Sequence, residues 1–121
     1  MNPVLFIFLG GGLGSLVRYG LGKLVQHQFV SNFPYGTLAV NVTASLVLGA
    51  FVGLELSKNL SPSFRAFIAI GFCGGFSTFS TFANDTLQLI QANRYTEAMF
   101  NVLLNVSICI IATFGGIWVM K

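Results

Sequence analysis

Four long apolar runs, separated by the few charged residues of the chain, constrain its fold more than any other feature. They cover residues 1–17, 36–54, 66–84 and 98–120. A helix needs about 20 mostly apolar residues to cross the hydrocarbon core of a bilayer, so the sequence predicts four transmembrane helices. Only 7% of the 121 residues are charged, whereas a soluble domain carries about 25%. We therefore expect an all-α, multi-pass membrane protein embedded in a lipid bilayer.

The expected organisation is a single transmembrane domain over residues 1–121. We expect the four helices at about 3–25, 35–56, 64–91 and 97–120, with short connections that cannot fold separately. Six Lys and Arg stand against three Asp and Glu. These charges are too few and too scattered for a nucleic-acid surface, so we expect no nucleic-acid partner.

The basic residues outside the spans are distributed almost evenly between the two sides of the membrane. The side with both termini carries Lys58, Arg65 and Lys121, and the other side carries Lys23 and Arg94. Orientation normally follows an excess of Lys and Arg on the cytoplasmic side. The near balance is compatible with insertion in both orientations and with an antiparallel homodimer. An ordinary fixed topology, set by the insertion machinery or by Arg18, is the alternative.

The third span makes a poor continuous helix. It contains two adjacent glycines, Gly74 and Gly75, followed by hydroxyl residues in the run GFCGGFSTFSTF at 71–82. Glycine weakens helix propensity, and Ser and Thr side chains compete for backbone hydrogen bonds. We therefore predict a break near 73–78. Broken helices at membrane depth lie inside protein or line wet cavities, and their freed carbonyls commonly bind ions. A kinked helix packed through small residues is the alternative.

Three phenylalanines recur every three residues around this break. The spacing of Phe76, Phe79 and Phe82 predicts that they lie along one side of the half-helix that follows. Hydroxyl residues alternate with them, so we expect the aromatic stripe to border a polar interior in part. The edge of a phenyl ring is electropositive and can help to hold an anion. Packing against lipid or core is the alternative role for these rings.

Polar side chains spaced four residues apart mark one face each of the second and fourth spans. They are Thr37, Asn41 and Ser45 in the second span, and Asn101, Asn105, Cys109 and Thr113 in the fourth. Two facing stripes of this kind describe a narrow hydrated path. Hydrogen bonding between the helices is the alternative.

Arg18 lies within the first span, where an ionisable residue is a functional hypothesis by default. It either draws an anion toward a vestibule or pairs with Glu55, Asp85 or a carbonyl group. The single histidine and the three widely separated acids form no catalytic constellation, so we do not expect an enzyme. The first span also lacks the carboxylate that a small proton-coupled exporter of cationic compounds needs.

Over essentially its whole length the chain resembles the Fluc (CrcB) family of small fluoride channels. The resemblance lies in the runs GGGLGSLVRY at 10–19, GTLAVN at 36–41 and GFCGGFSTFSTF at 71–82. It implies an antiparallel, dual-topology homodimer with two pores, four helices per subunit and a third helix that is broken near its middle. It also implies a passive fluoride-selective channel in the inner cell membrane that exports cytoplasmic fluoride and confers fluoride resistance. An exporter of cationic compounds and a non-conducting membrane scaffold are the alternatives.

The resemblance also implies roles for individual residues. The ring edges of Phe79 and Phe82 are expected to line the fluoride paths, and Asn41 is expected to donate a hydrogen bond to the ion. Ser80 and Thr113 are expected in a polar track along the pore. Backbone carbonyls of Gly74 and Ser77 from both subunits are expected to hold a structural sodium ion at the centre of the dimer. Cys109 stands where the family leads us to expect a hydroxyl.

Overall fold

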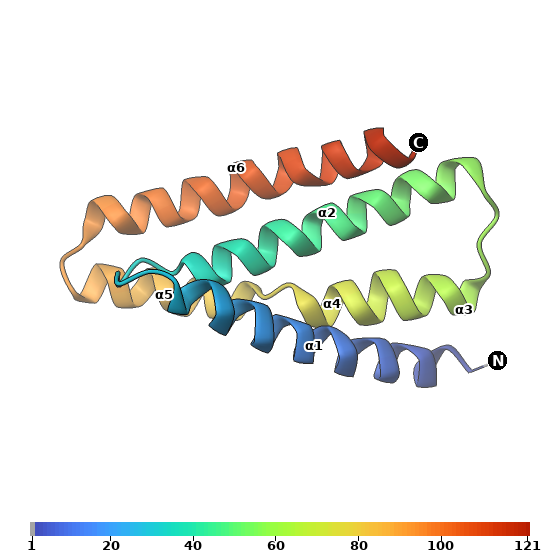
Figure 1. Ribbon diagram of the computed structural model, residues 1–121, viewed down its shortest axis with the longest axis horizontal. Coiled ribbons are helices and arrows are strands. Elements are labelled where there is room, and N and C mark those ends of the chain that lie inside the picture. Colours follow the sequence, from blue (N-terminus) through green and yellow to red (C-terminus); the bar gives the residue numbers. More distant parts are fainter. Residues whose placement is uncertain (1) are drawn as a thin grey trace.

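The computed structural model describes residues 2–121, and the elements within that range are helices (Figure 1). They are α1 (Pro3–His27), α2 (Tyr35–Ser57), α3 (Pro62–Arg65), the π-helix η1 (Ala66–Phe72), α4 (Cys73–Phe76), α5 (Phe79–Gln91) and α6 (Tyr95–Met120). The segments Pro3–His27, Tyr35–Ser57, Pro62–Gln91 and Tyr95–Met120 are long and apolar enough to cross a membrane. The predicted all-α fold with four membrane-spanning helices is confirmed.

Local side-chain chemistry explains where several helices begin. The Asn2 side chain accepts a hydrogen bond from the Val4 N–H at 3.0 Å, and Pro3 occupies the first turn of α1. Ser61 caps α3 in the same way, with its hydroxyl accepting from the Phe64 N–H at 3.1 Å. Such caps satisfy backbone donors that have no partner within the helix. The starts of these helices are therefore fixed by residues adjacent in sequence.

The third span is interrupted at Ser77 and Thr78, whose backbones are extended, with φ/ψ of −77°/156° and −147°/116°. The break falls at the end of the predicted range. Phe76 therefore ends α4, before the break, and is buried with Val40 and Ala44. The expectation that Phe76 lies on the second half-helix is wrong, because the chain leaves the helix only after this residue.

The span also contains a feature that was not predicted. Residues Ala66–Phe72 form a π-helix directly before α4. π-helices are rare and appear mostly as short insertions in α-helices. Hydropathy and helix propensity do not distinguish a π-helical turn from an α-helical one, so the sequence offered no signal for it.

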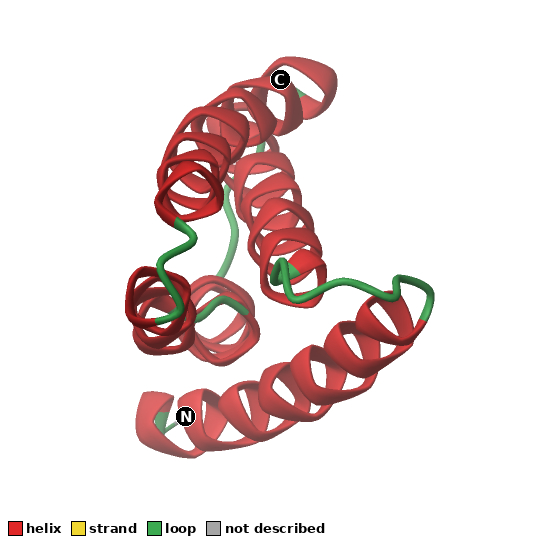
Figure 2. Cartoon of the chain, turned by 90° about the vertical axis from the view of Figure 1, so that its left-hand side faces the viewer, coloured by secondary structure: helices red, strands yellow, loops and turns green. Residues whose placement is uncertain are grey.

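The helices pack as two close pairs, which Figures 1 and 2 show from the side and from one end. α1 lies against η1 and α4, while α2 lies against α6. A Cβ atom on Gly10 would collide with the Phe67 carbonyl oxygen, and one on Gly49 would collide with the Thr113 carbonyl oxygen. Small residues at such crossings let backbones approach closely where lipid supplies no hydrophobic drive for association.

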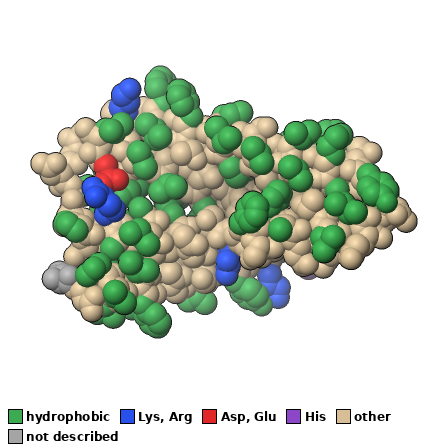
Figure 3. Space-filling model, turned by 180° about the vertical axis from the view of Figure 1, so that it is seen from behind, with side chains coloured by type: hydrophobic (Ala, Val, Ile, Leu, Met, Phe, Trp, Pro, Cys, Tyr) green, Lys and Arg blue, Asp and Glu red, His purple; other side chains and the backbone are tan. Residues whose placement is uncertain are grey.

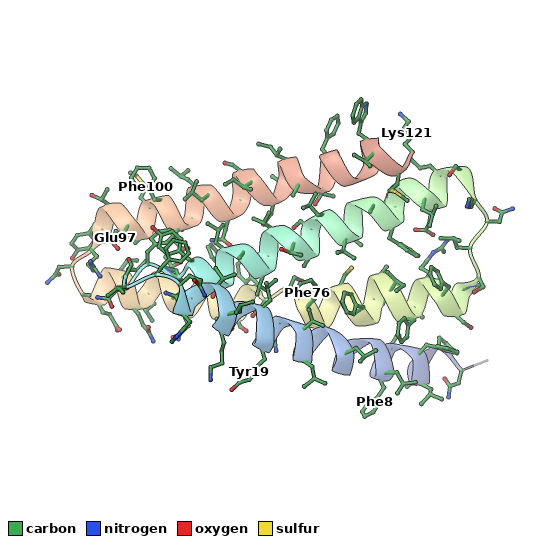
Figure 4. The ribbon with its side chains drawn as sticks, viewed as in Figure 1. Phe8, Tyr19, Phe76, Glu97, Phe100 and Lys121 are labelled. Atoms are coloured by element: carbon green, nitrogen blue, oxygen red, sulfur yellow. The ribbon has the colours of Figure 1, made fainter. Side chains whose placement is uncertain are left out.

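Large hydrophobic side chains cover the outside of the molecule, as expected for a protein surrounded by lipid. In Figure 3 patches of them are scattered across the visible face, and charged side chains are few. Phe8 points away from the other helices, whereas Phe76 lies between α2 and the third span (Figure 4). Both termini and the connection between α2 and α3 lie at the same end of the molecule (Figure 1). This arrangement follows from an even number of spans.

Candidate functional site at the break in the third span

Asn41 on α2 holds both backbone groups of Thr78 at the break. Its Oδ1 accepts a hydrogen bond from the Thr78 N–H at 2.9 Å, and its Nδ2 donates to the Thr78 carbonyl at 3.2 Å. In an uninterrupted helix the Thr78 N–H would donate to the carbonyl of Gly74, four residues earlier. The Asn41 amide takes that donor, so the Gly74 carbonyl is released from the helical pattern.

The side chain of Thr78 releases the Ser77 carbonyl in the same way, by taking the N–H that would bond it. Thr78 is the N-cap of α5, and its Oγ1 accepts from the Thr81 N–H at 3.2 Å. In a continuous helix the Thr81 N–H would donate to the Ser77 carbonyl. The Ser77 N–H still bonds the Cys73 carbonyl at 3.0 Å and closes α4. The break therefore releases the carbonyls from Gly74 to Ser77, because the Phe79 and Ser80 N–H groups at the start of α5 likewise leave the Gly75 and Phe76 carbonyls without helical partners. Gly74 and Ser77 are the two that the resemblance connects with sodium.

A cavity of about 240 Å³ lies beside the break. Its lining comes from α2, the break, α5 and α6, and consists of Asn41, Ser45, Ser77, Thr78, Phe79, Phe82, Asn105, Val106 and Cys109. The fold thus brings together Asn41, Phe79 and Phe82, three of the residues expected along the fluoride path. None of the lining residues carries a charge. Asn41 Nδ2 donates both of its hydrogens within the chain, to the Thr78 carbonyl and to Asn105 Oδ1, so a hydrogen bond from Asn41 to an ion would have to replace one of these two.

The two phenylalanines of this cavity differ in how far their own chain covers them. Their ring centroids are 5.4 Å apart, with an angle of 55° between the ring planes. Phe82 is only 9% exposed, whereas Phe79 is 79% exposed. A single chain therefore encloses one of the two rings and leaves the other uncovered.

Ser80 and Thr113, the other two residues expected along the path, do not line this cavity. Ser80 lies on an exposed part of α5. The Thr113 hydroxyl donates to the Cys109 carbonyl of its own helix at 2.9 Å. Cys109 does line the cavity, although its position was expected to carry a hydroxyl. Within one chain, Ser80 and Thr113 thus lie outside the cavity that contains Asn41, Phe79 and Phe82.

Much of the two polar stripes is engaged in hydrogen bonds between helices. Asn41 Nδ2 donates to Asn105 Oδ1 at 3.1 Å, which joins α2 to α6. Thr37 donates its hydroxyl to Asp85 Oδ2 at 2.7 Å, which joins α2 to α5. Asn101 is fully buried. The two stripes face one another as expected. At these positions their polar groups form hydrogen bonds between helices, which was the alternative to a hydrated path.

Arg18 lies on the other side of the break, next to a smaller cavity of about 160 Å³. Thr78 and Thr81 also line this cavity. Glu55 is paired with Arg65, whose Nε lies 2.6 Å from Glu55 Oε2. Neither Glu55 nor Asp85 forms an ion pair with Arg18 within residues 2–121. Thr78 thus lies between two cavities, one with aromatic rings and one with the arginine.

Gly74 and Ser77 present a surface that could hold a cation. Both line a shallow cavity of about 160 Å³ between α2 and the third span, and both are exposed in the single chain. A Cβ atom on Gly74 would have nothing within 4 Å outside its own stretch of helix. Within the described chain no cluster of His, Cys, Asp and Glu could ligate a metal. Carbonyl oxygens are suitable ligands for hard cations, so the released carbonyls fit the expected backbone ligands of sodium.

Comparison with known proteins gives matches over nearly the whole chain. Residues 5–117 match a family model described as CrcB-like protein, Camphor Resistance (CrcB). A protein of Shewanella pealeana, named fluoride-specific ion channel FluC, is 45% identical over 116 residues, which cover 96% of this chain and 94% of that protein. Proteins with the same name from Shewanella halifaxensis and Shewanella oneidensis are 42% and 40% identical, with the same coverage.

Proposed function

Because this chain belongs to the CrcB family, we propose that it is a fluoride-specific ion channel, and so a transport protein and not an enzyme. The observation that carries the proposal is the cavity at the break, which joins the Asn41 amide to the rings of Phe79 and Phe82. Fluoride is small and strongly hydrated, so a pore must replace its water with hydrogen-bond donors and electropositive ring edges. The uncharged lining binds an anion weakly enough to release it.

The transport is passive. Fluoride passes down its own electrochemical gradient, from the cytoplasm outward across the inner cell membrane. Arg18, beside the cavity at the other side of Thr78, attracts the anion toward the break by its charge. Replacing Arg18 with Gln should lower fluoride efflux most at low ionic strength, because salt screens such attraction over about 10 Å at 0.1 M. Equal efflux by both proteins at low salt would exclude this role.

A second copy of the chain, inserted in the opposite orientation, completes the path. Ser77, Phe79 and Ser80 are exposed in one chain, and polar groups are unfavourable against lipid hydrocarbon. A partner that covers this surface encloses Phe79 and places two pores in one antiparallel homodimer. Ser80 and Thr113 then contribute to the polar track. Single-molecule photobleaching in liposomes should give two steps per labelled channel, and one step would contradict the dimer.

The same surface accommodates the sodium ion at the dimer centre. The carbonyls of Gly74 and Ser77, released by Asn41 and Thr78, serve as its ligands from each subunit. When bound, the ion supplies positive charge that stabilises four carbonyl dipoles brought together in the middle of the membrane. On the side of the chain, Asn41 and Thr78 keep the two carbonyls free of helical hydrogen bonds.

Fluoride efflux from liposomes that hold the purified protein tests the function. A fluoride electrode and a chloride assay are used in parallel, with protein-free liposomes as the control. Fast fluoride release without chloride release supports the proposal. Absent release, or equal release of both ions, would contradict it.

A further inference from the structure

A directional chain of side-chain hydrogen bonds begins at the break and returns to α5. The Thr78 N–H donates to Asn41, and Asn41 Nδ2 donates to Asn105 Oδ1 at 3.1 Å. Asn105 Nδ2 donates to Asn101 Oδ1 at 3.0 Å. Asn101 Nδ2 donates to Thr86 Oγ1 at 2.9 Å, and the Thr86 hydroxyl donates to the Phe82 carbonyl at 2.8 Å. Each group accepts from the group before it and donates to the next.

The backbone of Thr78 requires one orientation of the Asn41 amide, with Oδ1 toward its N–H and Nδ2 toward its carbonyl. The direction of the hydrogen-bond chain supports the same orientation. An amide has one acceptor end and one donor end, which differ only in the placement of O and N. Asn105 presents its oxygen to Asn41 because its nitrogen donates to the main-chain carbonyl of Asn101 at 2.8 Å and to Asn101 Oδ1 at 3.0 Å. Asn101 presents its oxygen to Asn105 because its nitrogen is held by the Thr86 hydroxyl. If one member were reversed, two donors or two acceptors would face each other.

Two of the three amides in this chain of hydrogen bonds are deeply buried. Asn101 is 0% exposed and Asn105 is 6% exposed. Neither Asn101 nor Thr86 lines the cavity with Phe79 and Phe82. Hydrogen bonds in a medium of low dielectric constant are stronger and polarise one another along a chain. The buried amides of Asn101 and Asn105 therefore restrict the rotation of the Asn41 amide at the break.

We propose that Asn105, Asn101 and Thr86 are positioning residues that hold Asn41 in the orientation it needs at Thr78 and, through it, maintain the shape of the fluoride path. This inference rests on the proposed function. The chain begins at Thr78 and ends on Phe82, so it closes around the segment 78–82 that carries both aromatic rings. Asn41 is the only member that contacts the break directly among the three amides.

A matched pair of substitutions at Thr86 tests the proposal. Thr86→Val keeps the shape of the side chain and removes the hydroxyl, whereas Thr86→Ser keeps the hydroxyl. Thr86→Val removes two hydrogen bonds, the one from Asn101 Nδ2 and the one to the Phe82 carbonyl. One buried hydrogen bond changes the population of the arrangement it holds by about tenfold, so fluoride efflux should fall about tenfold or more in T86V and stay near wild type in T86S. Thr43→Val is the control, because the Thr43 hydroxyl bonds only the Ala39 carbonyl of its own helix. Asn101→Leu should lower efflux at least as far as T86V.

A second readout separates positioning from a general loss of structure. The side-chain amide resonance of Asn41, in protein labelled with 15N-asparagine and assigned through N41D, should shift in T86V but not in T86S or T43V. If T86V and N101L keep both the resonance and the efflux rate of the wild type, the positioning role is excluded. If N101L does not fold, the T86V and T86S pair decides alone. Wild-type protein that releases no fluoride would refute the proposed function, while the resonance would still report on the hydrogen-bond chain.

Discussion

Replacing Asn41 with leucine removes every hydrogen bond that connects α2 to the break. The Asn41 amide makes three hydrogen bonds, two with the backbone of Thr78 at the break and a third with Asn105 on α6. Hydrogen bonds between membrane helices contribute about 0.6 to 2 kcal/mol each, so N41L should destabilise the folded protein by about 2 to 6 kcal/mol. Leucine keeps the branched arrangement of four side-chain heavy atoms, but its two methyl groups are bulkier than the amide oxygen and nitrogen that they replace.

The loss of stability in N41L should be smaller if the backbone at the break rearranges. Without the Asn41 oxygen, the Thr78 N–H is free to donate to the Gly74 carbonyl, as in an ordinary α-helix. The third span then straightens locally, and the cavity with Phe79 and Phe82 changes shape. We therefore expect N41L to abolish fluoride efflux even if enough folded protein remains to be reconstituted.

The assay is fluoride efflux from liposomes at matched protein content, with stability measured by unfolding in mixed detergent micelles followed by circular dichroism. Thr43→Val on the same helix is the control, since its hydroxyl bonds only its own helix at the Ala39 carbonyl. N41L protein that conducts fluoride at the wild-type rate would show that Asn41 neither contacts the ion nor shapes its path. Unchanged stability would show that its three hydrogen bonds contribute nothing to the fold.

Three further predictions concern the rings and the glycines. Phe79→Ile and Phe82→Ile remove the electropositive ring edges and should each lower fluoride efflux about tenfold or more while the dimer persists; unchanged efflux in both would exclude the ring-edge role. At Gly74 an added Cβ has nothing within 4 Å outside its own stretch of helix, so Gly74→Val should fold but lower the dimer fraction and the bound sodium measured by elemental analysis; full retention of both would count against that site. Gly49→Val places a side chain against the Thr113 carbonyl and should destabilise the protein by about 1 to 3 kcal/mol, whereas an unchanged unfolding midpoint would contradict the close contact of α2 and α6.

The break in the third span shows how much of the structure the local sequence can predict. The paired glycines and the hydroxyl residues predicted an interruption near 73–78, and the structure has it at Ser77 and Thr78. The same pattern placed Phe76 after the break, whereas it is buried before it. Glycine and serine lower the stability of a helix over several residues, but they do not select the residue at which it ends. That choice depends on Asn41, which comes from another helix.

The membrane-spanning class, the number of spans and the presence of a break followed from the sequence, because hydropathy and helix propensity are properties of short stretches of chain. The tertiary structure decided which polar groups meet. In the folded chain Asn41 forms hydrogen bonds with Thr78 and Asn105, and Glu55 pairs with Arg65. The fold also leaves Phe79 exposed and buries Phe82. A polar stripe looks the same in sequence whether it faces water or another helix. Only the relative placement of helices, set by close contacts such as that of Gly49 with Thr113, determines the partner of each side chain.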